Sequence, residues 1–208
     1  MASYEMSGTR QRRPYRKRAR ARQEERTRLA ITEAAVELHR TVGPARTTVK
    51  EIAERAGVGR MTVYNHFGSD AELLEACSAH YMAGHPPPDP GALDAVTDPD
   101  ERLRLALGSL YAWYRETADM TGNALRDAPL VPALERVMSA KFWPLLEATA
   151  DAACAGRGLR GSRRGRVRAA ALVALDFATW QTLTRVGLDD SAAAELAARF
   201  VAAAQAEH

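Results

Sequence analysis

The fold of this chain is decided by the stretch Thr47–Leu74, which reads TTVKEIAERAGVGRMTVYNHFGSDAELL. Thr48 and Glu51 have the spacing of a capping box, in which the hydroxyl and the carboxylate each accept a backbone N–H at the start of a helix. A helix is therefore predicted over residues 49–56. Gly57 suits the left-handed conformation that closes a helix and begins a tight turn.

A second short helix is expected after this turn, over residues 60–67. Two short helices joined by a glycine-containing turn predict a helix-turn-helix, whose second helix enters the major groove of DNA. Ala53 is small enough to let the two helices approach closely, and Val63 fills the corner between them. A preceding helix over residues 23–41 completes a three-helix domain over residues 23–68, and a connecting helix follows over residues 69–84.

The composition extends the helical prediction to the whole chain. Of 208 residues, 46% are hydrophobic but only 6% are aromatic; alanine is frequent and runs of β-branched residues are rare. An all-α fold is therefore expected. No apolar stretch approaches the roughly 20 residues of a membrane span, and the N-terminus lacks a signal-peptide segment. We therefore expect a cytoplasmic, DNA-associated protein without a membrane partner.

The charge is unevenly distributed along the chain. Residues 1–68 carry 15 basic and 7 acidic side chains, an excess of +8, whereas residues 69–208 carry 14 and 19, an excess of −5. This division predicts an anion-binding N-terminal part and a separate sensor or partner part. Residues 1–22 lack apolar periodicity and hold closely spaced arginines, which predicts a disordered basic arm. Such an arm adds electrostatic affinity for DNA, or is only a solubilising tail.

The stretch Thr47–Leu74 also resembles the DNA-binding signature of TetR-family transcriptional regulators. The resemblance covers about the first third of the chain and is carried above all by Ile52-Ala53, Ala56-Gly57-Val58, Thr62-Val63-Tyr64 and His66-Phe67. It implies a homodimer whose paired recognition helices read the half-sites of a palindromic operator in double-stranded DNA. It also implies an all-helical C-terminal domain that dimerises and binds a small hydrophobic ligand.

The same resemblance assigns DNA-contacting roles to individual residues. Thr48, Tyr64 and His66 match the family's phosphate-contact positions. The family's groove-facing positions fall on Lys50, Arg60, Met61, Thr62 and Asn65. The chemistry agrees, because arginine pairs bidentately with guanine, asparagine pairs with adenine, and threonine or methionine can contact a thymine methyl.

Two residues depart from the family pattern. Gly59 stands where the family commonly has serine, so the recognition helix lacks a side-chain cap, at a cost of only a few tenths of a kcal/mol. Asp70 stands where the family usually has lysine, and a carboxylate there repels phosphate although it suits the helix dipole. We expect the arginines of the N-terminal arm to replace the missing backbone anchor.

Residues 85–208 are expected to form the helical ligand-binding and dimerisation domain. Prolines and glycines between Gly84 and Asp100 predict a loop or hinge. Beyond it, helices are predicted over residues 98–117, 121–127, 131–155 with a kink at Pro144, 166–186 and 191–206. The last two helices are alanine-rich and apolar on more than one face, so they must be covered on two sides. The resemblance implies that they form the dimer interface, the alternative being the buried core of a monomer.

Candidate ligand-binding residues are the aromatic, methionine and isolated polar side chains of this domain. They are Tyr111, Trp113, Tyr114, Met120, Asn123, Phe142, Trp143, Asp176 and Trp180. Packing in the core explains most apolar residues of these helices equally well. Asp176 lies in an apolar run, where it is either a hydrogen-bonded core acid or a ligand anchor.

These patterns favour a ligand-responsive DNA-binding regulator, a repressor released from its operator by a small hydrophobic molecule. A nonspecific or architectural DNA-binding protein that uses the basic arm alone is the alternative. An enzyme is disfavoured, because the five histidines have no nucleophilic or metal-binding spacing around them. Cys77 and Cys154 also lie outside any metal or redox motif, so neither catalytic residues, a metal nor a cofactor is expected.

Overall fold

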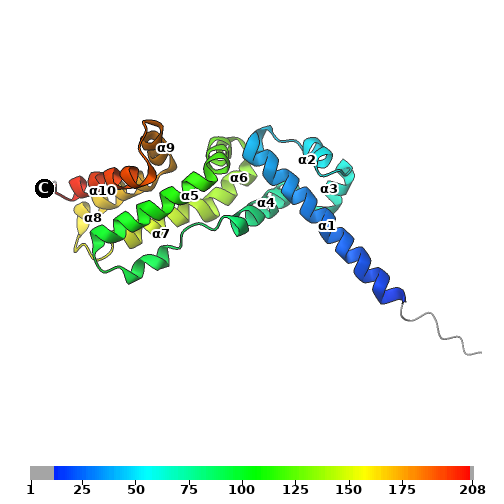
Figure 1. Ribbon diagram of the computed structural model, residues 1–208, viewed down its shortest axis with the longest axis horizontal. Helices are drawn as coiled ribbons and strands as arrows, with labels where there is room; N and C mark the ends of the chain where they lie inside the picture. Colours follow the sequence, from blue (N-terminus) through cyan, green and yellow to red (C-terminus); the bar gives the residue numbers. More distant parts are fainter. Residues whose placement is uncertain (1–11, 207–208) are drawn as a thin grey trace, which may run out of the picture.

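The computed structural model describes residues 12–206, with side chains from Tyr15, and every regular element in that range is a helix (Figure 1). A head of helices lies at one end of the elongated molecule and α8 and α10 lie at the other. The head contains α1 (Arg12–Thr41), the short 3₁₀ turn η1 (Pro44–Arg46), α2 (Val49–Arg55), α3 (Arg60–His66) and α4 (Asp70–Gly84), the helix that leads to the body. The body contains η2 (Pro90–Ala95), α5 (Pro99–Asp127), η3 (Ala128–Leu130), α6 (Pro132–Val137), the π-helical turn η4 (Met138–Phe142), α7 (Trp143–Cys154), α8 (Gly161–Leu175), α9 (Phe177–Arg185) and α10 (Asp190–Ala206).

Two hydrophobic cores hold these parts together, and α4 contributes to both. Leu73 and Cys77 of α4 pack with Ile31, Ile52 and other residues of the head. Leu74, one position along the same helix, belongs instead to the core of the body. Because α4 has buried faces toward both units, its position links the orientation of the head to the packing of the body.

The first helix begins earlier than predicted. It starts at Arg12 rather than at residue 23, so residues 12–22, which we expected to lie in a disordered arm, are helical. Residues 1–11 of the predicted arm lie outside the described residues. Arg20 forms an i,i+4 ion pair with Glu24 (2.9 Å), one of the local contacts that favour the helix over a disordered chain.

Helix boundaries in the body differ from the prediction at four places, one of which is the start of α8 at Gly161 instead of at residue 166. The two predicted helices over residues 98–117 and 121–127 are one continuous helix, α5, because no residue between them breaks the hydrogen-bonding pattern. The predicted kink at Pro144 is instead a π-helical turn, Met138–Phe142, directly before Pro144 at the start of α7.

The fourth difference is a break at Asp176, within the predicted helix over residues 166–186. The hydroxyl of Tyr111 donates to the Ala174 carbonyl (2.6 Å), and that of Tyr114 donates to the Leu175 carbonyl (2.9 Å). These bonds satisfy carbonyls at the end of α8, so the helix can stop there without buried unpaired groups. Asp176 then caps α9, its carboxylate accepting from the Ala178 N–H (2.7 Å).

Among the described residues, no helix has both the length and the apolar character that crossing a membrane requires.

Candidate nucleic-acid interface and adjoining cavity

The recognition helix α3 is positioned by local caps and by one buried corner. The predicted capping box is present: the Glu51 N–H donates to the Thr48 hydroxyl (3.2 Å), and the Thr48 N–H donates to the Glu51 carboxylate (2.8 Å). The Thr48 hydroxyl also donates to the Glu51 carboxylate (2.7 Å), and this bond, together with that from the Thr48 N–H, lowers the pKa of Glu51. Gly57 has a φ of 68°, as the turn between α2 and α3 requires, and Val63 is 1% exposed at the corner between them.

Most of the predicted DNA-contacting side chains lie exposed on α2 and α3. Arg60, Met61, Tyr64 and Asn65 follow the helical repeat and share one face of α3, where Met61 is 70% exposed. The remaining four are Thr48 and Lys50, which are exposed, and Thr62 and His66, which are half-buried. Lys50 forms only an exposed ion pair with Glu54 (3.7 Å), so its ammonium group stays available to another partner.

Arg28 of α1 supports α3, and the sequence analysis did not identify it. Its guanidinium lies 4.0 Å from the centre of the Phe67 ring and donates to the carbonyl of His66 at the end of α3. The same group is 3.4 Å from the carboxylate of Glu72 in α4. Arg28 therefore fixes the C-terminal end of α3 between α1 and α4. No local motif marks it, because its partners lie about forty positions away in the chain.

Ser69 and Glu72 cap the junction between α3 and α4. The Ser69 hydroxyl accepts from the Glu72 N–H (3.2 Å). The Glu72 carboxylate, however, accepts from the Gly68 N–H (3.0 Å) instead of from Ser69. Asp70 is the first residue of α4 and is exposed, so its carboxylate faces solvent beside the recognition helix.

An apolar cavity of about 250 Å³ lies where the head meets the body. Its head side is formed by α1, η1 and α4, and its body side by α5, α6, η4 and α7. The lining residues are His39, Pro44, Leu74, Cys77, Ser78, Tyr81, Met82, Pro87, Trp113, Met120, Thr121, Ala124, Leu134, Val137, Met138, Lys141, Phe142 and Leu145.

The few polar groups of this cavity carry little charge. Burial lowers the pKa of His39 to about 4, so the imidazole is neutral at pH 7. The Thr121 hydroxyl is occupied by a hydrogen bond to Thr117 (3.1 Å). Burial also raises the pKa of the Cys77 thiol to about 12, which keeps it protonated. Lys141 is the one charged residue of the lining, and it is exposed. The cavity therefore suits an apolar molecule.

Three of the nine predicted ligand-binding residues line this cavity, namely Trp113, Met120 and Phe142. Tyr111 and Tyr114 are fully buried, and their hydroxyls donate hydrogen bonds to carbonyls at the end of α8. Asp176 is half-buried, accepts a hydrogen bond as the cap of α9 and lies outside the cavity lining.

The remaining three predicted ligand-binding residues also lie outside the cavity. Trp180 donates from its indole nitrogen to Asp190 (2.9 Å), and Trp143 is 37% exposed. Asn123 contacts the backbone of α1. The residues that sequence reasoning missed, such as His39 and Tyr81, belong to the head, and only the packing of distant helices brings them to this wall.

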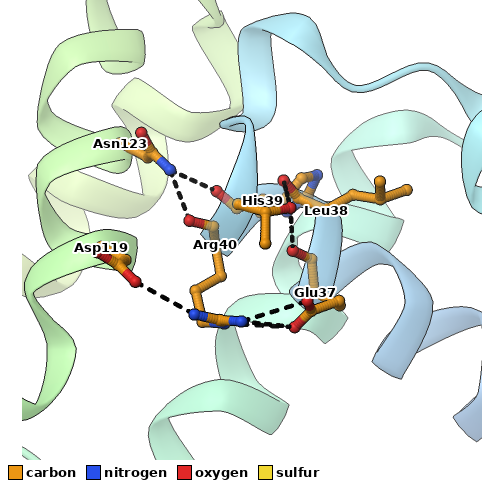
Figure 2. A network of polar contacts seen from close by, with 7 residues as sticks. Glu37, Leu38, His39, Arg40, Asp119 and Asn123 are labelled. Carbon is orange, nitrogen blue, oxygen red and sulfur yellow. Dashed lines mark hydrogen bonds and ion pairs between the residues drawn. The ribbon is translucent and has the colours of Figure 1, made fainter.

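The α5 residues beside the cavity hold the end of α1 through polar contacts (Figure 2). The side-chain amide of Asn123 donates to the carbonyls of His39 (3.2 Å) and Arg40 (2.7 Å), which are unpaired at the C-terminus of the helix. Arg40 in turn donates to Asp119 (3.2 Å), one turn earlier on α5, and to Glu37 of its own helix. We call these contacts of α5 with the end of α1 the α1–α5 junction.

The last turn of α5 extends this junction to the loop after α1. Arg126 donates to the Val42 carbonyl (3.1 Å), and the buried carboxylate of Asp127 accepts from the Ala45 N–H (3.0 Å). Hydrogen bonds from Arg126 lower the pKa of Asp127. Gly43, with a φ of 98°, packs so closely here that a Cβ atom would collide with both side chains.

These features define a helix-turn-helix DNA-binding head joined to an all-helical body with an apolar cavity at their boundary. A family model described as "Bacterial regulatory proteins, tetR family" matches residues 31–77, which include α2, α3 and the turn between them. Residues 31–77 are therefore similar to the DNA-binding part of TetR-family regulators.

Two curated relatives from Pseudomonas putida match one part of the chain only. They are the HTH-type transcriptional regulator TtgR and the probable HTH-type transcriptional regulator ArpR. Each is 50% identical over 50 residues, and the alignment spans 24% of this chain and 24% of the relative. Both are named as regulators of transcription, in agreement with the expectation that this chain is not an enzyme.

Solved structures share the fold over most of the chain. A proposed fatty acid metabolism regulator from Clostridium perfringens superimposes with a TM-score of 0.60 at 17% identity, covering 83% of this chain and 97% of that chain. A TetR transcription regulator from Haloarcula marismortui ATCC 43049 gives 0.55 at 19% identity, with coverages of 86% and 96%. At these identities the likeness is one of fold.

Proposed function

We propose that this chain is a ligand-responsive transcriptional repressor that binds a palindromic operator as a homodimer and is released by a small hydrophobic molecule. The exposed face of α3 carries the DNA-reading part of the proposal. Arg60 and Asn65 present the side chains that pair bidentately with guanine and adenine, and Met61 offers an apolar group to a thymine methyl. We further propose that it acts in the cytoplasm, on chromosomal DNA.

The test of DNA reading begins with genomic fragments selected for binding to the full chain. Arg60→Ala should weaken binding to a selected fragment by about tenfold or more, because a bidentate base contact is worth about 1–3 kcal/mol, and should change binding to random DNA little. Arg185→Ala, at an exposed arginine of α9 with the same charge change, is the control. Equal losses on both kinds of DNA for Arg60→Ala would contradict base reading.

The basic first half of α1 supports the alternative of a nonspecific or architectural DNA-binding protein. Its exposed cations, Arg16, Lys17, Arg18, Arg20 and Arg22, can neutralise phosphates without reading sequence. Removing residues 1–20 should weaken binding to selected and random DNA alike and reduce the dependence on salt. If wild type shows steep salt dependence and no sequence preference, this alternative replaces the repressor.

The shared walls of the apolar cavity support the ligand-responsive part of the proposal. Head helices α1 and α4 and body helix α5 all line it, so a molecule inside contacts both units at once. A ligand that fits better when the units are shifted would favour an arrangement whose two recognition helices no longer match successive major grooves. Binding of ligand and binding of DNA would then oppose each other by the same coupling free energy.

The cavity can be tested after a compound screen for release of the selected DNA. Ser78→Phe places a ring into the lining from α4 and should abolish release by an active compound while the chain still binds DNA. Ala79→Phe, at the next residue, which is exposed and outside the lining, should release normally. Unchanged release from Ser78→Phe would move the ligand site elsewhere.

A further inference from the structure

The turn between α7 and α8 lies at the end of the body that is far from the recognition helix (Figure 1). A second cavity is lined by residues of this turn and of the helices on either side of it. It has a volume of about 190 Å³ and no part in the proposed function. Its lining consists of Asp151, Cys154, Ala155, Gly156, Arg157, Gly158, Leu159, Arg164 and Arg168. Three arginines and one carboxylate make the lining strongly basic, whereas the chain beyond residue 68 is acidic as a whole.

The cations of this cavity are not all neutralised within the protein. Arg168 is paired with Asp151 through two contacts of 2.6 and 3.3 Å. Arg164, one helical turn earlier on α8, has no ion-pair partner among the described residues. Cys154 adds no negative charge, because burial raises the pKa of its thiol. One arginine of the lining is therefore available to an external anion.

Arg157 supplies a buried donor without a partner. Its side chain is only 4% exposed, and its terminal nitrogens donate to Asp100 (2.7 Å), Gln205 (2.7 Å) and the Pro99 carbonyl (2.8 Å). Its Nε, by contrast, is buried and has no hydrogen-bond partner. No other buried side-chain nitrogen or oxygen of the described residues lacks a partner. A buried guanidinium donor left unpaired is costly, and an acceptor atom in the cavity would satisfy it.

The start of α8 adds a favourable field for negative charge. Its N-cap residue, Arg160, makes no side-chain cap, and the first turn holds no acidic residue. The unpaired N–H groups and the helix dipole there favour an anion, yet arginines follow at positions 163, 164, 166 and 168. Acidic residues are usually preferred at a helix N-terminus, whereas this one is followed by arginines. An external anion would supply the negative charge that the first turn lacks.

From these observations we propose that the α7–α8 cavity binds one small oxyanion, a phosphate or a short-chain carboxylate. Arg164 pairs with its charge, and the Nε–H of Arg157 donates to one of its oxygens. The volume exceeds the roughly 150 Å³ that holds a benzene-sized molecule, so an ion of a few heavy atoms fits. The site is separate from the apolar cavity, and the proposal that it binds an anion does not depend on DNA binding.

Calorimetric titration of the full chain with inorganic phosphate, and separately with succinate, tests the proposal. Wild type should bind at least one of the two at one site per chain. Arg164→Gln should weaken that binding about tenfold, as expected for loss of a charge-assisted hydrogen bond. Arg160→Gln is the matched control, because Arg160 is exposed, has the same charge and lies outside the lining. The two titrations also distinguish a phosphate site from a carboxylate site.

A second measurement places the ion in the cavity. Cys154 lines it and is half-buried, whereas Cys77 is buried with a pKa of about 12, so a neutral maleimide reports on Cys154. The bound anion should slow labelling of wild type and of Arg160→Gln, but not of Arg164→Gln. The proposal is overturned if neither anion saturates below about 10 mM. It is also overturned if Arg160→Gln loses as much affinity as Arg164→Gln.

Discussion

Asp70 carries a negative charge at the edge of a DNA-binding head whose net charge is positive. It is exposed at the first position of α4, directly after the Ser69 cap, where a carboxylate suits the helix but repels a phosphate. Asp70→Lys should therefore tighten operator binding and steepen its dependence on salt, by roughly 0.9 in the logarithmic slope for one added phosphate contact. Binding measured across a salt series, with Asp94→Lys on the exposed η2 turn as control, checks this. An unchanged affinity and slope would mean that position 70 does not face the DNA backbone.

His39 should make the stability of the chain depend on pH. Burial lowers its pKa from 6.5 to about 4, so between these values the unfolded chain binds a proton that the folded chain excludes. Stability is therefore complete above pH 6.5 and falls as the pH decreases toward 4. Between pH 7.5 and pH 5 the loss should be about 2 kcal/mol. Urea unfolding at both values should show this loss in wild type beyond that of His39→Gln, and parallel pH profiles would contradict it.

Individual residues also show where sequence reasoning succeeds. The Thr48–Glu51 box and the turn at Gly57 are confirmed, because each depends on atoms only a few positions apart. Arg28 and Tyr111 act on partners 38 and 63 positions away, and no local pattern marks such contacts. Asp176 had a local signal, a carboxylate two residues before the N–H that it accepts, but the apolar run around it suggested a buried helix instead.

At the scale of helices, the α1–α5 junction joins a cavity wall to the head. Asn123 lies between Thr121 and Ala124, which line the cavity, and donates to two carbonyls at the end of α1. Asn123→Ala should lower the free energy of unfolding by about 1–2 kcal/mol, because half-buried acceptors lose their donor. Amide hydrogen exchange should also quicken over residues 38–46.

The control for this variant is Asp119→Ala, which removes the exposed ion pair with Arg40 from the same junction. A pair of this kind contributes about 0–1 kcal/mol, so the control should change stability little. Equal losses of stability in the two variants would show that the junction stabilises the chain through its charges and not through the hydrogen bonds of Asn123 at the end of α1.

Apart from the start of α1, the helix boundaries of the head were predictable, whereas several of those in the body were not, for one physical reason. The head elements end at glycines or begin at side-chain caps, which the sequence displays. The body helices end where side chains of other helices form hydrogen bonds with their backbone, as the two tyrosines of α5 do at the end of α8. The residues that line the apolar cavity could likewise not be predicted from the sequence, because they come from helices far apart in the chain.

At the scale of the whole molecule, the prediction that most needs a measurement is the dimer. The alanine-rich helices α8 and α10 pack against the body, yet α8 leaves Val173 64% exposed and α10 leaves Phe200 50% exposed. Apolar groups that are left in water on neighbouring helices favour burial against a second copy. Light scattering should give a mass of twice 22.7 kDa for wild type.

The combined variant Val173→Glu and Phe200→Glu should shift that mass to a single chain, because a dimer contact there would bury two unpaired charges. Val186→Glu, at a residue 73% exposed after α9, is the control and should remain dimeric. A dimer that survives the combined variant would place the interface on another surface.

The π-helical turn Met138–Phe142 gives the apolar cavity a wall of adjustable shape. A π turn holds an extra residue per turn, and such turns often mark functional sites. Relaxation of this turn to α-helix would rotate Phe142 relative to Met138 about the helix axis, because each residue of an α-helix turns through a larger angle than in a π turn. Both residues line the cavity, so that change would alter its contour while α6 and α7 keep their hydrogen bonds. If the cavity takes a ligand as proposed, a wall of adjustable shape would let it accept apolar molecules of more than one size.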